Sequence, residues 1–186
     1  MKENETPKKN ESFLSFISLI VTAVIIALLI RSFVFSSNLV IGESMHPSFE
    51  EKDKLISLIF PLYFSDPKRG DVVIIDAPEE KGKEYIKRVV GLPEDDIKIK
   101  NGSIYINDEI YEENYTEENV PTEIYNLDHW KLDKDEFFVV GDNRLPNKSM
   151  DSRYFGAVEK KSIKGIVKFR FWPLKKIGTV GGLNGK

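Results

Sequence analysis

Residues 97–106 read Ile97-Lys-Ile-Lys-Asn-Gly-Ser-Ile-Tyr-Ile106 and carry the clearest folding signal in the chain. The pair Asn101-Gly102 favours a type I′ turn, because both residues tolerate positive φ angles. On either side of the pair, apolar and polar residues alternate with a period of two, as they do in a strand with one buried face. The segment therefore predicts a β-hairpin.

Outward from this hairpin, further short runs are rich in Val, Ile, Phe and Tyr and are separated by turn residues. These runs are residues 38–41, 54–59, 71–75, 85–90, 137–140 and 163–171. No long helical periodicity follows residue 35. We therefore expect the body of the chain to be mainly β, as a sandwich, a barrel or a coiled sheet.

The N-terminal part differs from this body, because residues 13–30 contain no charge. A helix of this length would span about 27 Å, the short end of a membrane crossing. A cleaved signal peptide has a shorter apolar run and a small-residue cleavage site, whereas Arg31 and aromatic residues follow here. A buried core helix would show a single apolar stripe, but residues 20–30 are apolar on every face apart from Thr22. We expect one transmembrane helix.

Positive charges near this run predict its orientation. Lys2, Lys8 and Lys9 precede it, and between residues 31 and 51 only Arg31 follows it. The positive-inside rule then leaves the N-terminus in the cytoplasm and the rest of the chain outside.

The composition excludes several chemistries. The chain has 186 residues, 27 Lys and Arg against 30 Asp and Glu, two His and no Cys, with a net charge of -3. The absence of Cys excludes disulfides, a thiol nucleophile and Cys-based metal sites. The near-neutral charge gives no general reason to bind nucleic acid. The mean hydropathy of -0.30 averages the apolar run with a polar body.

The two His offer poor candidates for a Ser-His-Asp triad. The nearest match to a nucleophile elbow, G-x-S-x-G, is residues 42–46, where His46 replaces the second Gly. His46 also lies only two residues after Ser44, and His129 follows an acidic loop as a surface or packing residue would. An ordinary triad is therefore not expected.

Residues 107–119 contain six acids and no base. Hard metal ions bind carboxylates, but the Asp-x-Asp-x-Asp-Gly spacing of a calcium loop is missing. We expect a solvated loop here.

Lysine is the alternative base for a serine nucleophile. At its ordinary pKa only about one Lys in 2,500 is neutral at pH 7, so a catalytic Lys needs burial in an apolar run. Lys87, in Tyr-Ile-Lys-Arg-Val-Val, best fits this requirement, and strand alternation places it on one face with Tyr85 and Val89, with Arg88 on the other. An edge-strand Lys in water is the alternative. The S-x-x-K match at residues 65–68 contains a Pro and lacks the helix that motif needs.

Four segments occur together in a specific order: Ser44-Met-His-Pro47, Arg69-Gly-Asp-Val-Val73, Tyr85-Ile-Lys-Arg-Val-Val-Gly-Leu-Pro93, and Gly141-Asp-Asn-Arg144 with Ser149-Met-Asp-Ser-Arg153. In this order and spacing the chain resembles bacterial type I signal peptidases of the single-anchor form over residues 13–172. The resemblance implies a coiled β-sheet catalytic domain of the signal peptidase/LexA-like type. It also implies cleavage of N-terminal signal peptides from secreted precursors after small residues, in an A-x-A pattern.

The resemblance further implies that Ser44 is the nucleophile and Lys87 the general base, without cofactor or metal. The Ser44 N–H would hold the oxyanion. Some relatives add a Ser hydroxyl two residues before the nucleophile, but Gly42 stands at that position here and leaves the second donor unassigned.

The remaining motif residues have supporting roles by the same resemblance. Ser149 would orient Lys87, and Arg88 would pair with Asp142. The remaining motif residues would be mainly structural, namely Arg144, Asp151 and Arg153. The chain departs from the family at three places, which are Ser48 for Thr, Glu94 for Gly, and two extra residues within the segment 145–148 before Ser149.

These expectations combine into one architecture. It has a cytoplasmic leader (residues 1–12), a transmembrane helix (13–31), an extracytoplasmic β-rich catalytic domain (32–172) and a flexible tail (173–186). The partners would be the signal peptides of precursors, bound as an extended strand, and the lipid bilayer, but no nucleic acid. Met45, Phe49 and residues 58–64 would form either an apolar rim at the lipid or part of the core. The chain would be monomeric.

Two other functions fit parts of the pattern. A self-cleaving repressor relative shares the Ser-Lys chemistry, but the apolar N-terminal run and the absence of a DNA-binding domain argue against it. A membrane-tethered, non-catalytic β module would leave Lys87 as an ordinary surface residue.

Overall fold

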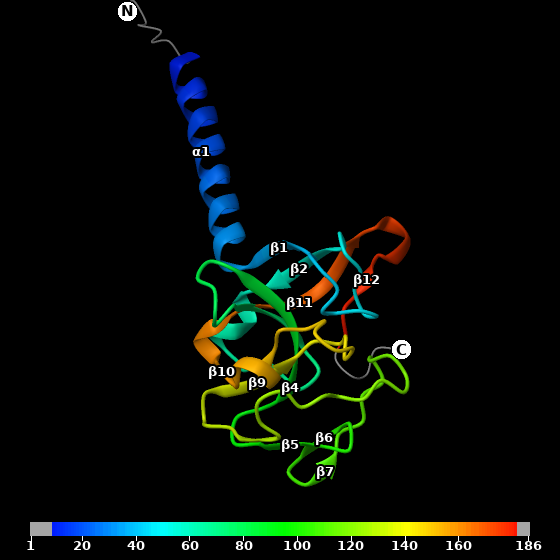
Figure 1. Cartoon of the computed structure of the whole chain (residues 1–186). Coiled ribbons are helices and arrows are strands. Elements are labelled where there is room, and N and C mark those ends of the chain that lie inside the picture. The colour runs from blue at the N-terminus through cyan, green and yellow to red at the C-terminus, as the bar shows by residue number, and fades with distance from the viewer. Residues whose placement is uncertain (1–8, 182–186) are drawn as a thin grey trace, which may run out of the picture.

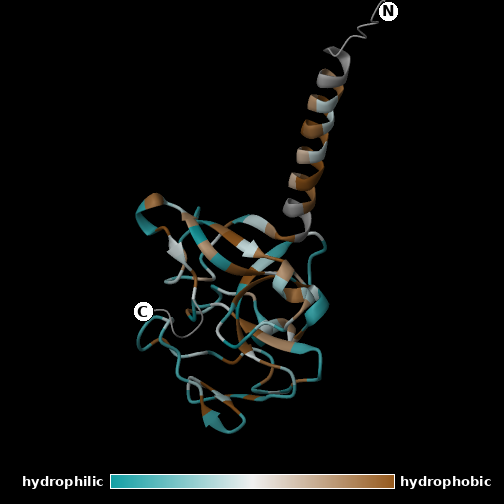
Figure 2. Ribbon diagram, turned by 180° about the vertical axis from the view of Figure 1, so that it is seen from behind, coloured by the Kyte–Doolittle hydropathy of each residue, from teal (hydrophilic) through white to brown (hydrophobic). Residues whose placement is uncertain are grey.

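The structure, a computed structural model, describes the backbone of residues 9–181 and the side chains of residues 13–29 and 34–181. Helix α1 (Lys9–Phe33) projects from a β-rich body (Figure 1). The predicted N-terminal helix is thus confirmed. Its described residues are largely hydrophobic (Figure 2). Within the described residues, no helix combines the length and the apolar character that a membrane crossing requires. Residues 1–8 of the expected leader lie outside the described residues.

The larger sheet holds eight strands, and its paired neighbours are antiparallel. Its path runs β1-β2-β11-β3-β4-β9-β10, and β12 pairs with β11. The strands are β1 (Phe35–Leu39), β2 (Lys54–Leu58), β3 (Val72–Asp76), β4 (Glu84–Gly91), β9 (Glu136–Val140), β10 (Val158–Glu159), β11 (Ile163–Trp172) and β12 (Gly178–Thr179). All six runs predicted outside the hairpin contribute to this sheet, which confirms the mainly β body.

The smaller sheet contains the predicted hairpin. Its order is β7-β6-β5-β8, with β5 (Asp96–Lys100), β6 (Ser103–Ile106), β7 (Glu109–Ile110) and β8 (His129–Lys131). Ile97 pairs with Ile106 and Lys100 with Ser103 across the turn. Asn101 and Gly102 have φ angles of 52° and 79°, as a type I′ turn requires.

The core forms because the central strands are buried on both faces. The first four residues of β3 and the last four of β9 are all buried, whereas burial alternates along β5 and β6. One apolar cluster below the β1 loop joins side chains of that loop, which follows β1, to side chains of the larger sheet. Its buried members are Val40, Met45, Phe49, Leu55, Val72, Ile74 and Val167. Met45 and Phe49 are only 1% and 3% exposed, so they belong to the core and not to a lipid-facing rim.

Short helices connect the strands, namely η1 (Phe60–Tyr63), α2 (Ser152–Phe155), η2 (Lys160–Ser162) and η3 (Leu174–Lys176). Part of the segment expected to be a flexible tail is folded back onto the sheet. η3 follows Pro173, β12 pairs with β11, and Val180 packs against the cluster below the β1 loop. Residues 182–186 of that tail lie outside the described residues.

Candidate active site

Ser44 lies in the loop between β1 and β2, in a series of turns that begins after Gly42. Gly42 has a φ of +83°, a conformation that favours glycine at this position. The next residue, Met45, fixes the loop to the core by its buried side chain. The Asn143 N–H donates to the Ser44 carbonyl at 3.0 Å, and the Asn143 side-chain amide donates to the Glu43 carbonyl at 3.0 Å. The Ser44 loop is therefore held by the packing of Met45 in the core and by the two hydrogen bonds from Asn143.

Lys87 lies on β4, opposite Val73 of β3, and is only 2% exposed. Its ammonium donates a hydrogen bond of 3.0 Å to the Ser44 Oγ. The Tyr85 ring lies 4.8 Å from the Lys87 Nζ, on the face that strand alternation predicts for both residues. The fold thus brings together two residues that are 43 positions apart in the sequence.

Burial lowers the pKa of Lys87 from 10.5 to about 8, because desolvation disfavours the ammonium form. The carboxylates of Asp151 and Glu79 act in the opposite direction but do not cancel this effect. About a tenth of the Lys87 amines are therefore neutral at pH 7, compared with about one in 2,500 at the ordinary pKa. A neutral amine in contact with a hydroxyl can accept its proton.

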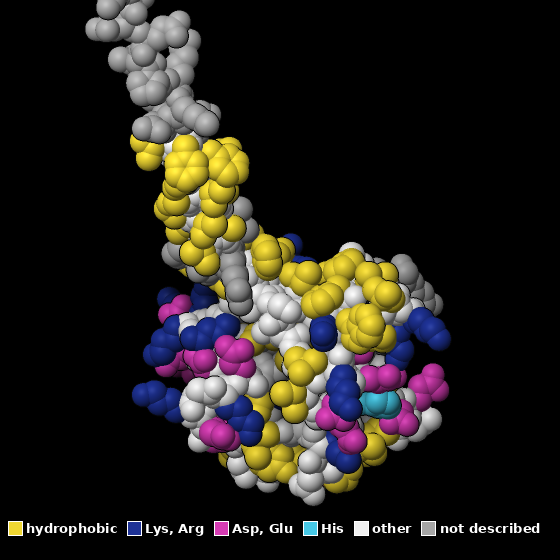
Figure 3. All heavy atoms as spheres, turned by 90° about the horizontal axis from the view of Figure 1, so that it is seen from above, with side chains coloured by type: hydrophobic (Ala, Val, Ile, Leu, Met, Phe, Trp, Pro, Cys, Tyr) yellow, Lys and Arg dark blue, Asp and Glu magenta, His cyan; other side chains and the backbone are white. Residues whose placement is uncertain are grey.

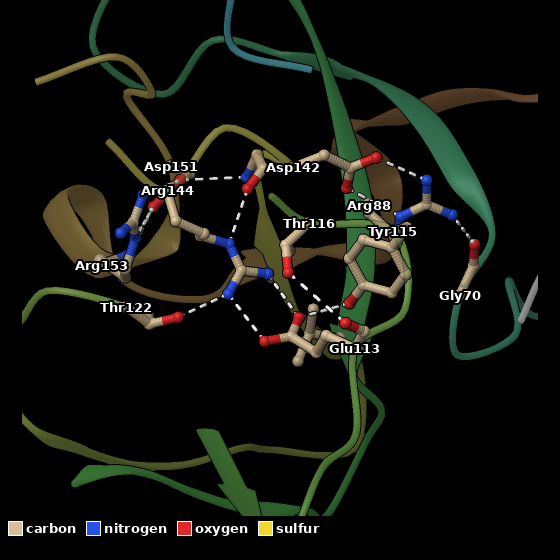
Figure 4. Close-up of polar contacts among 12 residues, drawn as sticks. Gly70, Arg88, Glu113, Tyr115, Thr116, Thr122, Asp142, Arg144, Asp151 and Arg153 are labelled. Carbon is tan, nitrogen blue, oxygen red and sulfur yellow. Dashed lines mark hydrogen bonds and ion pairs between the residues drawn. The ribbon is translucent and has the colours of Figure 1, made fainter. Parts of the chain in front are cut away.

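Arg88 occupies the opposite face of β4 and forms a buried ion pair with Asp142. Its Nε and Nη2 contact the two carboxylate oxygens at 2.8 and 2.5 Å, and its Nη1 donates to the Gly70 carbonyl (Figure 4). The predicted partnership of Arg88 with Asp142 is thus present. The Ser48 hydroxyl accepts from Arg88 at 3.3 Å, so this departure from the family keeps a hydroxyl in the network.

Asp151 and Arg153 form a second buried pair, in which both side chains are fully enclosed. Arg153 donates to the two Asp151 oxygens at 2.9 and 2.8 Å, and the Gly141 N–H donates to Asp151 at 3.0 Å. Burial alone would raise the pKa of Asp151, but these bonds hold it below its ordinary value. The pair therefore supports the turn at Gly141, as its expected structural role requires.

Ser149 is 1% exposed and lies so close to Gly141 that a Cβ added to this glycine would overlap the Ser149 Oγ. Within the described part of the chain, this hydroxyl has no hydrogen-bond partner. The bond from Ser149 to Lys87 that the resemblance implies is therefore not formed in this structure. The extra residues before Ser149 form a turn whose Lys148 pairs with Glu43 at 2.7 Å. Glu94, which stands where the resemblance implies a glycine, adopts a φ of +70°, a conformation that favours glycine.

Most side chains of residues 107–119 are exposed, as expected for a solvated loop, but Glu113 is an exception. Its carboxylate pairs with the buried guanidinium of Arg144, with one contact at 2.7 Å, and Arg144 also donates to Thr122 and to the Gly141 carbonyl (Figure 4). Burial lowers the pKa of Arg144, but the Glu113 charge outweighs this effect and raises it. The Tyr115 ring stacks on Arg88, 4.1 Å from its guanidinium carbon. The acidic segment therefore holds the loop that carries Asp142.

Sequence reasoning missed Asn143 and Glu113. Asn143 had a local signal, since it stands between Asp142 and Arg144 in one motif. Glu113 had none, since its partner lies 31 residues away. His129 is exposed and contacts Asp96, outside the dyad. In the described residues, no group of three or more His, Asp or Glu lies close enough to hold a metal ion.

Comparisons with known proteins show the family to which the chain belongs. The family model described as signal peptidase, peptidase S26, matches residues 13–172. The chain is 37% identical over 185 residues to signal peptidase I of Bacillus licheniformis, covering 95% of this chain and 98% of the relative. It is 34% identical over 184 residues to a probable signal peptidase I-2 of Synechocystis, covering 96% and 82%.

A solved structure also resembles the chain. The crystal structure of a signal peptidase I from Enterococcus faecalis V583 is 28% identical, with a TM-score of 0.46 over 55% of this chain and 97% of that one. The family model matches most of this chain, and the chain in turn covers most of the length of its curated relatives. The chain belongs to the signal peptidase family, peptidase S26.

Proposed function

We propose that this signal peptidase is a membrane-anchored serine endopeptidase that removes N-terminal signal peptides from secretory precursors, with Ser44 as nucleophile and Lys87 as general base. The observation that carries the assignment is the 3.0 Å contact between the Lys87 Nζ and the Ser44 Oγ. The burial that brings the pKa of Lys87 to about 8 supports the role of base.

In the first step, the neutral amine of Lys87 takes the Ser44 proton as the Ser44 Oγ bonds to the scissile carbonyl carbon. The carbonyl oxygen becomes an oxyanion, for which the Ser44 N–H is the proposed donor. Among the hydrogen bonds of the described residues, none uses this N–H. When the tetrahedral intermediate collapses, the C–N bond breaks and Lys87 returns its proton to the leaving amine, which becomes the N-terminus of the mature protein.

In the second step, Lys87 is neutral again and takes a proton from a water molecule. The water oxygen bonds to the acyl carbon, the ester bond to Ser44 breaks, and the Ser44 Oγ recovers its proton. The signal peptide leaves with a free carboxylate. One amine therefore serves both halves of the reaction.

The substrate would bind as an extended strand beside the Ser44 loop and β4, with small side chains at the first and third positions before the cut. Ala-x-Ala is the corresponding sequence.

Helix α1 is the proposed anchor, with the N-terminus in the cytoplasm and the body outside. From Phe13 to Leu29 its side chains are exposed and mostly apolar, and residues 13–30 contain no charge. Hydrophobic side chains also gather on the face of the body turned toward α1 (Figure 3). Exposed apolar residues of the body include Phe60, Phe64, Trp172 and Leu174. Anchoring would hold the site close to membrane-inserted signal peptides and raise their effective concentration.

The test is cleavage of a purified precursor with an Ala-x-Ala boundary by the full-length enzyme in detergent. Ser44→Ala and Lys87→Ala are expected to lose activity by at least about a thousandfold, because each removes one half of the dyad. Ser65→Ala is the matched control, since Ser65 is an exposed serine outside the site. Wild-type rates in either dyad variant would refute the proposal.

A further inference from the structure

Asn143 bonds to two consecutive carbonyl groups of the Ser44 loop. Its side-chain amide donates to the Glu43 carbonyl at 3.0 Å, and its backbone N–H donates to the Ser44 carbonyl at 3.0 Å. Asn143 is only 6% exposed, so water competes little for these bonds. The peptide group that joins Glu43 to Ser44 is thus held from another part of the chain.

This peptide group contains the Ser44 N–H, the proposed donor to the oxyanion. A trans peptide group is planar, so its C=O and its N–H point in opposite directions and turn together. A bond that fixes the direction of the Glu43 carbonyl therefore also fixes the direction of the Ser44 N–H. Within the described residues this N–H donates to no acceptor, so it is available to a substrate oxygen.

The turn around Ser44 supplies a single further bond to the Glu43 carbonyl, from the His46 N–H at 3.0 Å. One bond leaves the peptide plane able to swing about that contact. The preceding residue, Gly42, has a φ of +83° and lacks a Cβ that would restrict its backbone. The second bond, from Asn143, is therefore the restraint that comes from outside the turn.

The orientation of the Asn143 amide is itself fixed. Its Oδ1 accepts the Leu145 N–H at 3.1 Å, and a backbone N–H acts only as a donor. The Nδ2 end of the amide therefore faces the Glu43 carbonyl and not the reverse.

Buried ion pairs anchor both sequence neighbours of Asn143. Asp142 pairs with Arg88, and Arg144 pairs with Glu113. These pairs hold the loop after β9 in one position on both sides of the amide. The buried charges thus determine where Asn143 places its hydrogen-bond donors.

We propose that Asn143 is a positioning residue that sets the direction of the Ser44 N–H toward the oxyanion of the substrate. It acts through the Glu43–Ser44 peptide group and takes no proton. The inference rests on the proposed attack of Ser44 on a precursor. It gives one donor a fixed direction in a site where Gly42 supplies no side-chain donor.

Two variants change the Asn143 amide in different ways. Asn143→Ala removes the bond to the Glu43 carbonyl but keeps the backbone N–H. Asn143→Asp keeps the size of the side chain and replaces the donating NH₂ by an oxygen that only accepts. Asn126→Ala is the matched control, because the Asn126 amide also donates to a backbone carbonyl, that of Tyr154 at 2.7 Å, but lies exposed and outside the site.

The first measurement is cleavage of an Ala-x-Ala precursor by the full-length enzyme in detergent. At about pH 9.5 most Lys87 amines are neutral, so a small change in the pKa of Lys87 alters the rate little. Both Asn143 variants should lower kcat by about thirtyfold and leave KM within about twofold, because a misdirected donor loses much of the hundredfold or greater effect of an oxyanion donor. Asn126→Ala should leave both constants within about twofold of wild type.

The second measurement separates the direction of the donor from substrate binding. When a peptide aldehyde ending in Ala-x-Ala binds, the Ser44 Oγ bonds to the aldehyde carbon and the Ser44 proton passes to Lys87. The carbon–oxygen double bond becomes single and leaves an oxyanion on the aldehyde oxygen. The matching peptide alcohol binds without this step. In both Asn143 variants the aldehyde should bind about thirtyfold less tightly, whereas the affinity for the alcohol should be unchanged.

The contrary results have distinct meanings. Wild-type kcat and aldehyde affinity in either Asn143 variant would overturn the inference. An equal loss of aldehyde and alcohol binding in both variants would also overturn it, because Asn143 would then maintain the fold of the site and not the direction of one donor. Failure of the wild-type enzyme to cleave the precursor, or full cleavage by Ser44→Ala, would instead contradict the proposed function.

Discussion

Lys87 is almost completely buried although its side chain carries a positive charge when protonated. Burial makes the ammonium form unfavourable, which brings the pKa to about 8. The same burial places the Nζ against the Ser44 hydroxyl. The activity and the stability of the protein should therefore depend on pH through one residue.

The first prediction concerns the pH dependence of the single-turnover cleavage rate. Only neutral Lys87 accepts the Ser44 proton, so the rate should rise about tenfold per pH unit below 8 and level off above it. Lys87→Arg should be inactive across this range, because a guanidinium stays protonated. A flat wild-type profile between pH 6 and 9 would exclude Lys87 as the base.

The second prediction concerns stability. The folded-state pKa of Lys87 lies below its unfolded value, so the unfolded state binds the proton more tightly between about pH 8 and 10.5. The resulting destabilisation is complete below pH 8 and disappears as pH rises through this window. Lys87→Met should therefore raise the free energy of unfolding by about 3 kcal/mol at pH 7 and by little above pH 10.5. Denaturant titrations of the detergent-solubilised chain at both pH values measure this, and an equal difference at the two values would contradict it.

At the scale of elements, the acidic segment after β7 and the loop after β9 stabilise each other through buried charge. Glu113 meets Arg144, and Tyr115 stacks on Arg88. Both arginines lie close to Asp142, so the segment supports the same loop that carries Asn143 to the Ser44 carbonyl.

This arrangement gives the third prediction. Glu113→Gln keeps the size of the side chain but leaves the Arg144 charge buried beside a neutral partner, which should cost about 3 kcal/mol of stability. Glu112→Gln, at the exposed neighbouring position, should change stability by less than about 0.5 kcal/mol. Thermal or denaturant unfolding separates the two variants. Equal effects would mean that the Glu113–Arg144 pair is not important for stability.

Elements with a local signal could be predicted from the sequence. The hairpin at Asn101-Gly102 and the six strand runs follow from alternation and turn chemistry within a few residues. Short strands such as β7, β8 and β12 carry no such signal, because two or three residues become a strand only when a partner strand is present. Their existence depends on tertiary contacts.

The site shows the same limit. The contact between Ser44 and Lys87 could be predicted, because both residues lie in specific motifs and a lysine base needs a buried environment. The Glu113 contact joins residues 31 positions apart, and the Asn143 contact to Glu43 joins residues 100 apart. The Ser149 hydroxyl lies against Gly141, and no local sequence pattern predicts that it lacks a partner among the described residues.

At the scale of the whole molecule, helix α1 leads into the β-rich body, and Ser44 lies one short strand beyond the end of this helix. α1 ends at Phe33, β1 ends at Leu39, and Ser44 follows within five residues. An anchor at α1 would therefore fix the site near the membrane surface, where a membrane-inserted signal peptide ends.

The fourth prediction tests this topology. The chain has no Cys, so single-cysteine variants give an unambiguous label. In intact cells an impermeant maleimide should label Asn114→Cys in the body, whereas Asn4→Cys in the leader should react only after permeabilisation. The reverse pattern would place the body in the cytoplasm and refute the proposed orientation.

The central claim is that the Ser44 Oγ attacks the substrate carbonyl with Lys87 as its base. Acid quenching of the full-length enzyme during turnover of a signal-peptide ester, followed by mass-spectrometric peptide mapping, tests it most directly. We expect an acyl adduct on the peptide that contains Ser44, and neither adduct nor product in Ser44→Ala. An adduct on a different residue, or wild-type turnover by Ser44→Ala, would contradict it.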